Sequence, residues 1–113
     1  MSESTDAATA VKAKSRTDLI IELSQLIDEV RLKVRKARSE KAYGRYVGIL
    51  TTLYGILLKA ESGEVLSEED RGEIEKAMAH LIKRIPRRAE LIRRITRRVQ
   101  KIVPQKGVVI YAV

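Results

Sequence analysis

The sequence contains no cysteine, so it can form neither disulfide bonds nor thiolate metal sites. It has a single histidine, His80, and no pair of residues stands at a metal-ligand spacing. It also lacks a glycine-rich phosphate loop after a strand and a nucleophile paired with a base. We therefore expect no metal, no cofactor, no catalytic residue and no enzymatic activity. His80 is interpreted as a residue at the surface or the edge of the core.

Phenylalanine, tryptophan and asparagine are also absent. The core must therefore be aliphatic, supplemented by some of the four tyrosines. Few thermolabile residues, together with 34% charged residues, indicate a thermophilic source. The length of 113 residues is enough for one domain and not for two.

No long hydrophobic segment is present. The longest uncharged segment, residues 46–58, is shorter than the roughly 20 apolar residues that span a bilayer, so it is typical of a core helix. No apolar segment resembling a secretory signal begins the chain, and we expect a cytoplasmic protein. Membrane binding is not expected, because the basic segments lack tryptophan and phenylalanine anchors.

The helix expected around residues 46–58 carries small residues on one narrow strip, at spacings of 4, 3 and 4. Because each glycine costs roughly 1 kcal/mol in a helix interior, this strip indicates close packing of another backbone. The contact could be made within the chain or by self-association. The strip consists of Gly44, Gly48, Thr51 and Gly55.

We expect three segments: a disordered tail at residues 1–16, a single helical domain at 17–103 and an extended tail at 104–113. The first helix should begin at Thr17 as N-cap and follow a heptad seam. Glu22, Asp28 and Glu29 would mark its solvent side. The seam consists of Ile20, Leu23, Ile27, Val30, Val34 and Ala37.

Local signals predict where the helices break. The seam is interrupted near Ser39, a loop follows at residues 61–67, and Ser67 precedes three acidic residues that suit a helix start. Pro86 should kink the next helix or start a new one. The fold is therefore predicted to be all-α, either an antiparallel helical hairpin or a four-helix bundle. The tail at 108–113 could pack on this bundle or add as a strand to a partner's sheet.

The formal net charge of +8 is concentrated in two places. Residues 80–107 hold ten lysines and arginines against Glu90 alone, and a second basic cluster occupies residues 31–45. On a helical wheel, seven cations of the first block share one face opposite an apolar face. These candidate nucleic-acid-binding residues are Lys83, Arg87, Arg93, Arg94, Arg97, Arg98 and Lys101.

Three functions fit this cationic face: a solvated surface, a site for phosphates, or a docking surface for an acidic protein or an anionic membrane. Arginine binds phosphate bidentately, and a basic stripe is typical of nucleic-acid binding, so we expect DNA or RNA as the partner. An architectural or accessory role through backbone contacts follows, since few side chains could read bases. The alternative is a subunit of a homo-oligomer or larger complex. The 31–45 cluster could join the stripe if residue 38 lay opposite residue 88.

Between Arg45 and Asp70, the segments ILTTLYGILLKAES and LSEED resemble the small all-helical subunits of CRISPR ribonucleoprotein effectors. The resemblance covers about a quarter of the chain and rests on common residue types. It implies a helical subunit that lines a nucleic-acid groove without catalysis. It assigns a role to no individual residue.

Overall fold

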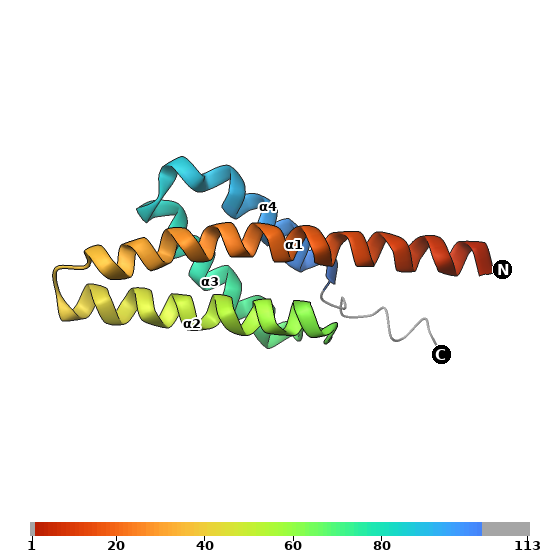
Figure 1. Ribbon diagram of the computed structural model, residues 1–113, viewed down its shortest axis with the longest axis horizontal. Coiled ribbons are helices and arrows are strands. Elements are labelled where there is room, and N and C mark those ends of the chain that lie inside the picture. Colours follow the sequence, from red (N-terminus) through yellow and green to blue (C-terminus); the bar gives the residue numbers. More distant parts are fainter. Residues whose placement is uncertain (1, 103–113) are drawn as a thin grey trace.

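The computed structural model describes residues 2–102, and the side chains of residues 16–101, as an all-α protein without a strand. Figure 1 shows the order of the helices. The predicted tail at 104–113 lies outside the described residues. The elements are α1 (Ser2–Lys36), α2 (Glu40–Ser62), α3 (Glu68–Arg84), the 3₁₀ turn η1 (Pro86–Arg88) and α4 (Ala89–Ile102).

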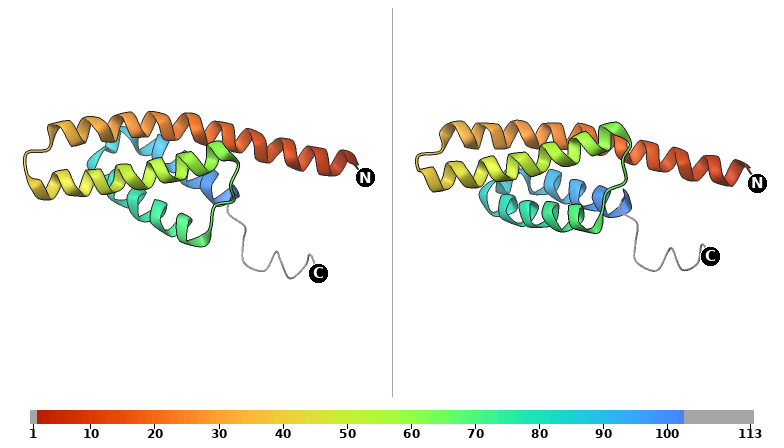
Figure 2. Two further views of the ribbon diagram at one scale, coloured as in Figure 1. Left: turned by 60° about the horizontal axis from the view of Figure 1, so that its bottom comes forward. Right: turned by 90° about the horizontal axis from the view of Figure 1, so that it is seen from below.

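The four helices form a bundle in which each helix has two neighbours. Helix α1 packs against α2 and α4, and α3 packs against the same two helices. Successive helices run in opposite directions, as the two further views show (Figure 2). Of the two predicted architectures, the four-helix bundle is therefore the observed one.

The core is aliphatic, as the composition predicted. Tyr46 is the only buried tyrosine among the described residues. Helix α1 turns Leu19 and Leu26 into the core, whereas Ile20 of the predicted seam is only partly buried. The largest fully buried side chains are Leu19, Leu23, Leu26, Val30, Leu53, Leu66, Ile74, Leu81, Ile92, Ile95 and Val99.

Helix α1 begins at Ser2, whereas the sequence analysis expected a disordered tail and a start at Thr17. Residues 2–16 contain four alanines and neither glycine nor proline, so nothing in them stops a helix from continuing. This part of α1 projects beyond the other three helices (Figure 1).

The predicted breaks are confirmed. Ser39 caps α2 by accepting a hydrogen bond from the Ala42 N–H at 3.1 Å. Gly63 ends α2 in the left-handed conformation, with φ of 77°, which glycine adopts without strain. Ser67 and Asp70 form a capping box at the start of α3. Pro86 opens the 3₁₀ turn that separates α3 from α4.

Lys59 and Asp70 join the end of α2 to the start of α3. The Lys59 ammonium lies 2.8 Å from both carboxylate oxygens of Asp70, which also accepts from the Ser67 N–H. Burial alone would raise the pKa of Asp70, but the hydrogen bonds from Lys59 and Ser67 hold that pKa below its ordinary value. This ion pair and the capping box together fix the connection between α2 and α3, which spans residues 63–67.

Helix α2 is not buried on all sides, which corrects the prediction of a core helix. Tyr43 and Tyr54 are 53% and 39% exposed, and Leu58 is 66% exposed. A Cβ atom built on Gly44, Gly48 or Gly55 would meet nothing within 4 Å. The glycines of the small-residue strip therefore make no close backbone contact with the part of the chain that the structure describes. The apolar residues surround α2, so the sequence alone did not show which side faces inward.

Candidate nucleic-acid interface

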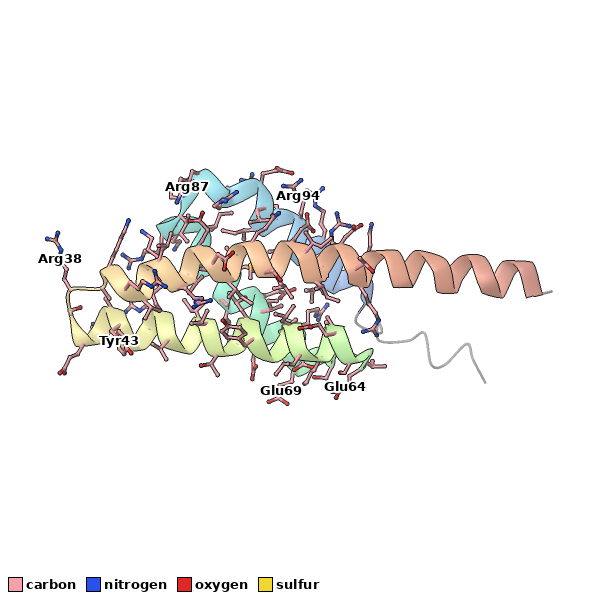
Figure 3. All side chains as sticks on the ribbon, in the orientation of Figure 1. Arg38, Tyr43, Glu64, Glu69, Arg87 and Arg94 are labelled. Atoms are coloured by element: carbon pink, nitrogen blue, oxygen red, sulfur yellow. The ribbon has the colours of Figure 1, made fainter. Side chains whose placement is uncertain are left out.

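Part of the predicted arginine stripe lies against α1, where acidic side chains meet it (Figure 3). The Glu22 carboxylate accepts a hydrogen bond from Arg98 and lies 3.3 Å from Arg94 Nε. Arg98 also lies 3.4 Å from the Asp18 carboxylate. The hydrogen bond to Glu22 raises the pKa of Arg98 above its ordinary value, although burial acts in the opposite direction. These contacts join the middle of α1 to α4.

A second acidic residue of α1 meets the turn between α3 and α4. Glu29 forms ion pairs with Arg87 at 2.7 Å and with Arg88 at 3.1 Å. The side chains of Glu22 and Glu29 are each only 11% exposed, so Glu22 faces α4, Glu29 faces η1, and neither lies on the solvent side predicted for it. Residue 88 therefore lies opposite residue 29 and not opposite residue 38.

These pairs change the electrostatics of the stripe. Arg87, Arg88, Arg94 and Arg98 face three carboxylates of α1, so the group carries a single net positive charge. Arg97 lies 3.5 Å from Glu90, and both side chains are mostly exposed. Of the seven predicted residues, only Lys83, Arg93 and Lys101 are exposed without an ion pair among the described residues.

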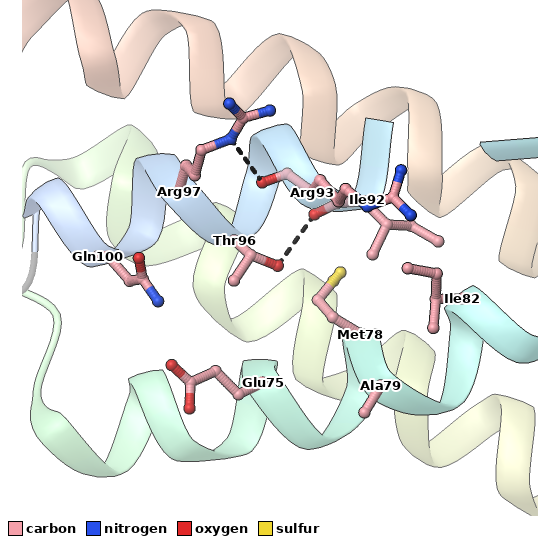
Figure 4. Close-up of a pocket in the computed structure, with 9 residues that line it drawn as sticks. All are labelled: Glu75, Met78, Ala79, Ile82, Ile92, Arg93, Thr96, Arg97 and Gln100. Atoms are coloured by element: carbon pink, nitrogen blue, oxygen red, sulfur yellow. Dashed lines mark hydrogen bonds between the residues drawn. The ribbon is translucent and has the colours of Figure 1, made fainter. Parts of the chain in front are cut away.

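A groove of about 560 Å³, which the sequence analysis did not anticipate, runs between α3 and α4 (Figure 4). Met78, Ile82 and Ile92 give it an apolar surface, and Arg93 and Arg97 lie on the α4 side. Two helices separated by a turn form its walls. A helical wheel describes only one segment, so it could not predict this groove.

The second basic cluster lies at the turn between α1 and α2. We call it the hairpin cluster, and Arg38 marks its position in Figure 3. None of its members forms an ion pair among the described residues, and all but Lys33 are exposed. It consists of Arg31, Lys33, Arg35, Lys36, Arg38, Lys41 and Arg45.

The last turn of α3 adds two cations, Lys83 and Arg84, and the effect of these charges and of Arg45 is seen at His80. Burial lowers the pKa of His80, and the positive charges of Arg45, Arg84 and Lys83 lower it further. The Nε2 atom of His80 is buried without a hydrogen-bond partner in the described part of the chain, and the ring meets Tyr46 edge-on at 6.1 Å. His80 is therefore a residue at the edge of the core, and it reports a positive potential from two helices.

The opposite end of α2 is acidic. Glu61, Glu64, Glu68, Glu69 and Glu73 surround the connection between α2 and α3. Figure 3 shows Glu64 and Glu69 at this end and Arg38 at the other. The molecule, 57 Å in its longest dimension, thus carries positive charge at one end of α2 and negative charge at the other.

Comparisons with known proteins found no matching family model, curated protein or solved structure. The described residues include no helix that is both long and apolar enough to cross a membrane. They also include no group of three or more side chains suited to hold a metal ion. None of these comparisons supports the resemblance to CRISPR effector subunits.

Proposed function

We propose that this protein binds the backbone phosphates of a nucleic acid through the hairpin cluster together with Lys83 and Arg84. One observation carries the proposal. Nine cations, eight on three helices and Arg38 on the connection between α1 and α2, gather in one region, and none of them has an ion pair among the described residues. Even after Asp28 and Glu40 are counted, the region carries seven net positive charges.

This region attracts phosphates more strongly than the α4 stripe, because three carboxylates of α1, together with Glu90, offset part of the positive charge there. Each phosphate neutralised by a lysine or arginine releases condensed counterions. Five of the nine cations are arginines, whose guanidinium groups can bind phosphate oxygens in pairs. The exposed residues Arg93 and Lys101 of α4 are then secondary contacts.

Binding is expected to depend little on base sequence. The chain has no asparagine, so one of the two side chains that pair bidentately with adenine is absent. Tyr43, which is 53% exposed and close in sequence to Lys41 and Arg45, offers a ring on which an unpaired base could stack. We propose an architectural or accessory role without catalysis.

Fluorescence anisotropy with labelled single- and double-stranded DNA and RNA tests the proposal. The variant Arg35→Glu/Lys36→Glu/Arg38→Glu should lose binding, because it replaces three cations of the hairpin cluster by anions. The matched control Arg93→Glu/Arg97→Glu/Lys101→Glu makes the same change in charge on α4 and should retain most of the affinity. Circular dichroism should show unchanged helicity in both variants.

Two results would overturn the proposal. One is the absence of binding to all four probes at low salt. The other is a loss of affinity in the α4 variant that equals or exceeds the loss in the hairpin variant. The second result would restore the α4 stripe as the interface.

A further inference from the structure

A cavity of about 490 Å³ opens between α2 and α3. Its volume falls within the roughly 300–1,000 Å³ of small-molecule sites. The first half of α2 and the middle of α3 form its walls, and the two helices run in opposite directions (Figure 2). The residues that decide its chemistry are Arg45, Gly48 and Thr52 of α2, and Glu73, Lys76 and His80 of α3.

The cavity adjoins the region proposed to bind phosphates. Arg45 belongs to the hairpin cluster and also lines the cavity. On the other wall, His80 lies one turn before Arg84, and the charges of Arg45, Lys83 and Arg84 all lower its pKa. A phosphate bound by Arg45 would therefore lie at the edge of the cavity. Since one sugar joins each phosphate to its base, an unpaired base of the same nucleotide would lie beside the opening.

The lining of the cavity suits a base better than a second phosphate. Ile49 and Ala77, which are 9% and 6% exposed, contribute apolar surface. The Glu73 carboxylate would repel a phosphate, but it can accept a hydrogen bond from an N–H group, which every standard base carries. The Lys76 ammonium can donate to a ring nitrogen or carbonyl oxygen of a base. Neither Glu73 nor Lys76 forms an ion pair among the described residues.

His80 adds an aromatic ring to the wall. Tyr46, which is buried, meets this ring edge-on with 6.1 Å between the ring centres and so limits its movement. Burial and the nearby positive charges lower the pKa of His80, so the imidazole is uncharged at neutral pH. Unpaired bases stack on aromatic side chains, histidine among them.

Gly48 leaves the α2 wall of the cavity open. A Cβ atom added there meets nothing within 4 Å, so no contact in the described part of the chain requires glycine at this position. Glycine destabilises a helix interior, whereas a larger side chain at Gly48 would occupy part of the cavity.

We propose that the α2–α3 cavity binds one unpaired base of a single-stranded nucleic acid whose phosphates lie on the hairpin cluster. The inference rests on the proposed function and adds a preference for single strands to it. A base can enter the cavity from a single strand, whereas a duplex must first unpair and unstack that base.

Two labelled DNA strands of equal length separate contact with bases from contact with phosphates. One is an ordinary single strand, and the other has the same backbone with abasic sites in place of its bases. Both present the same number of phosphates, so the hairpin cluster should bind both in anisotropy titrations. The ordinary strand should bind about fivefold more tightly or better, because stacking of one base contributes at least that much affinity.

Gly48→Leu should remove this difference, because the leucine side chain occupies the cavity. Gly55→Leu is the matched control and should retain the difference. It makes the same change on the same helix, where an added Cβ also meets nothing within 4 Å, and Gly55 does not line the cavity. Both variants replace glycine by a better helix former, so circular dichroism should show no loss of helicity.

The outcomes distinguish the two proposals. Equal affinity of the unaltered chain for the two strands would overturn the base-binding cavity and leave phosphate binding intact. A preference for the ordinary strand that survives in Gly48→Leu would place the base elsewhere, such as on Tyr43, and would also overturn the cavity. If neither strand binds at low salt, the proposed function fails and this inference fails with it.

Discussion

The Glu22 carboxylate of α1 accepts a hydrogen bond from the Arg98 guanidinium of α4, 76 positions further along the chain. Glu22 is only 8% exposed, and Arg94 lies on the same carboxylate. This pairing fixes one side of α4 to α1. It also explains why the most arginine-rich helix of the protein is not its most positive surface.

Glu22→Gln should lower the free energy of unfolding by about 2 kcal/mol, since it weakens a charged hydrogen bond at a largely buried position. The control Glu90→Gln alters an exposed pair with Arg97 and should change that energy by less than about 0.5 kcal/mol. Urea unfolding followed by circular dichroism measures both changes. Equal effects in the two variants would contradict a structural role for Glu22.

Glu29→Gln should have two separate effects. Removing the carboxylate frees Arg87 and Arg88, so stability should fall while affinity for nucleic acid rises severalfold at low salt. Anisotropy titrations alongside urea unfolding separate the two effects. Glu75→Gln on α3 is the control, because it removes the same negative charge. Glu75 lines the α3–α4 groove and has no ion pair among the described residues, so its replacement frees no arginine and should not tighten binding.

Asp70→Asn should destabilise the protein and flatten its response to acid. The folded pKa of Asp70 lies below its ordinary value of 3.8, so its contribution to stability is complete above that pH. The contribution is lost as the pH falls through the lower folded pKa. Urea unfolding between pH 6 and about pH 2 should therefore show a smaller loss of stability in Asp70→Asn than in the unaltered chain. Parallel curves for the two proteins would count against the Lys59–Asp70 pair.

His80 should make the protein less stable as the pH falls below 6.5, its ordinary pKa. The folded pKa is lower, so the unfolded chain takes up the proton first and the folded state loses stability. NMR titration of the ring measures the folded pKa directly. His80→Gln, a neutral residue of similar polarity, should remove this part of the pH dependence, and a ring that titrates at or above 6.5 would refute the explanation.

The ends of the helices could be predicted from the sequence because their causes are local. Ser39, Gly63 and Ser67 lie within a few residues of the groups they cap. The start of α1 was not predicted, because Thr17 resembles a cap while the alanine-rich segment before it can continue the helix. A capping residue permits a helix to begin but does not require it.

The candidate site was only partly predictable, since its electrostatics depend on contacts between distant segments. A helical wheel of α4 places its cations on one face but does not show that Glu22 and Glu29 lie opposite them. The same limit applies to α2, whose apolar residues surround the helix. Only the assembled bundle shows that Gly44 and Gly48 face outward.

The most direct test of the central claim is the salt dependence of nucleic-acid binding, measured by anisotropy for the unaltered chain and for Arg35→Glu/Lys36→Glu/Arg38→Glu. If about six of the hairpin cations contact phosphates of duplex DNA, log affinity should fall against log salt with a slope of about −5. The variant should bind too weakly for a slope to be measured. Undetectable binding by the unaltered chain at low salt, or equal slopes for the two proteins, would contradict the account.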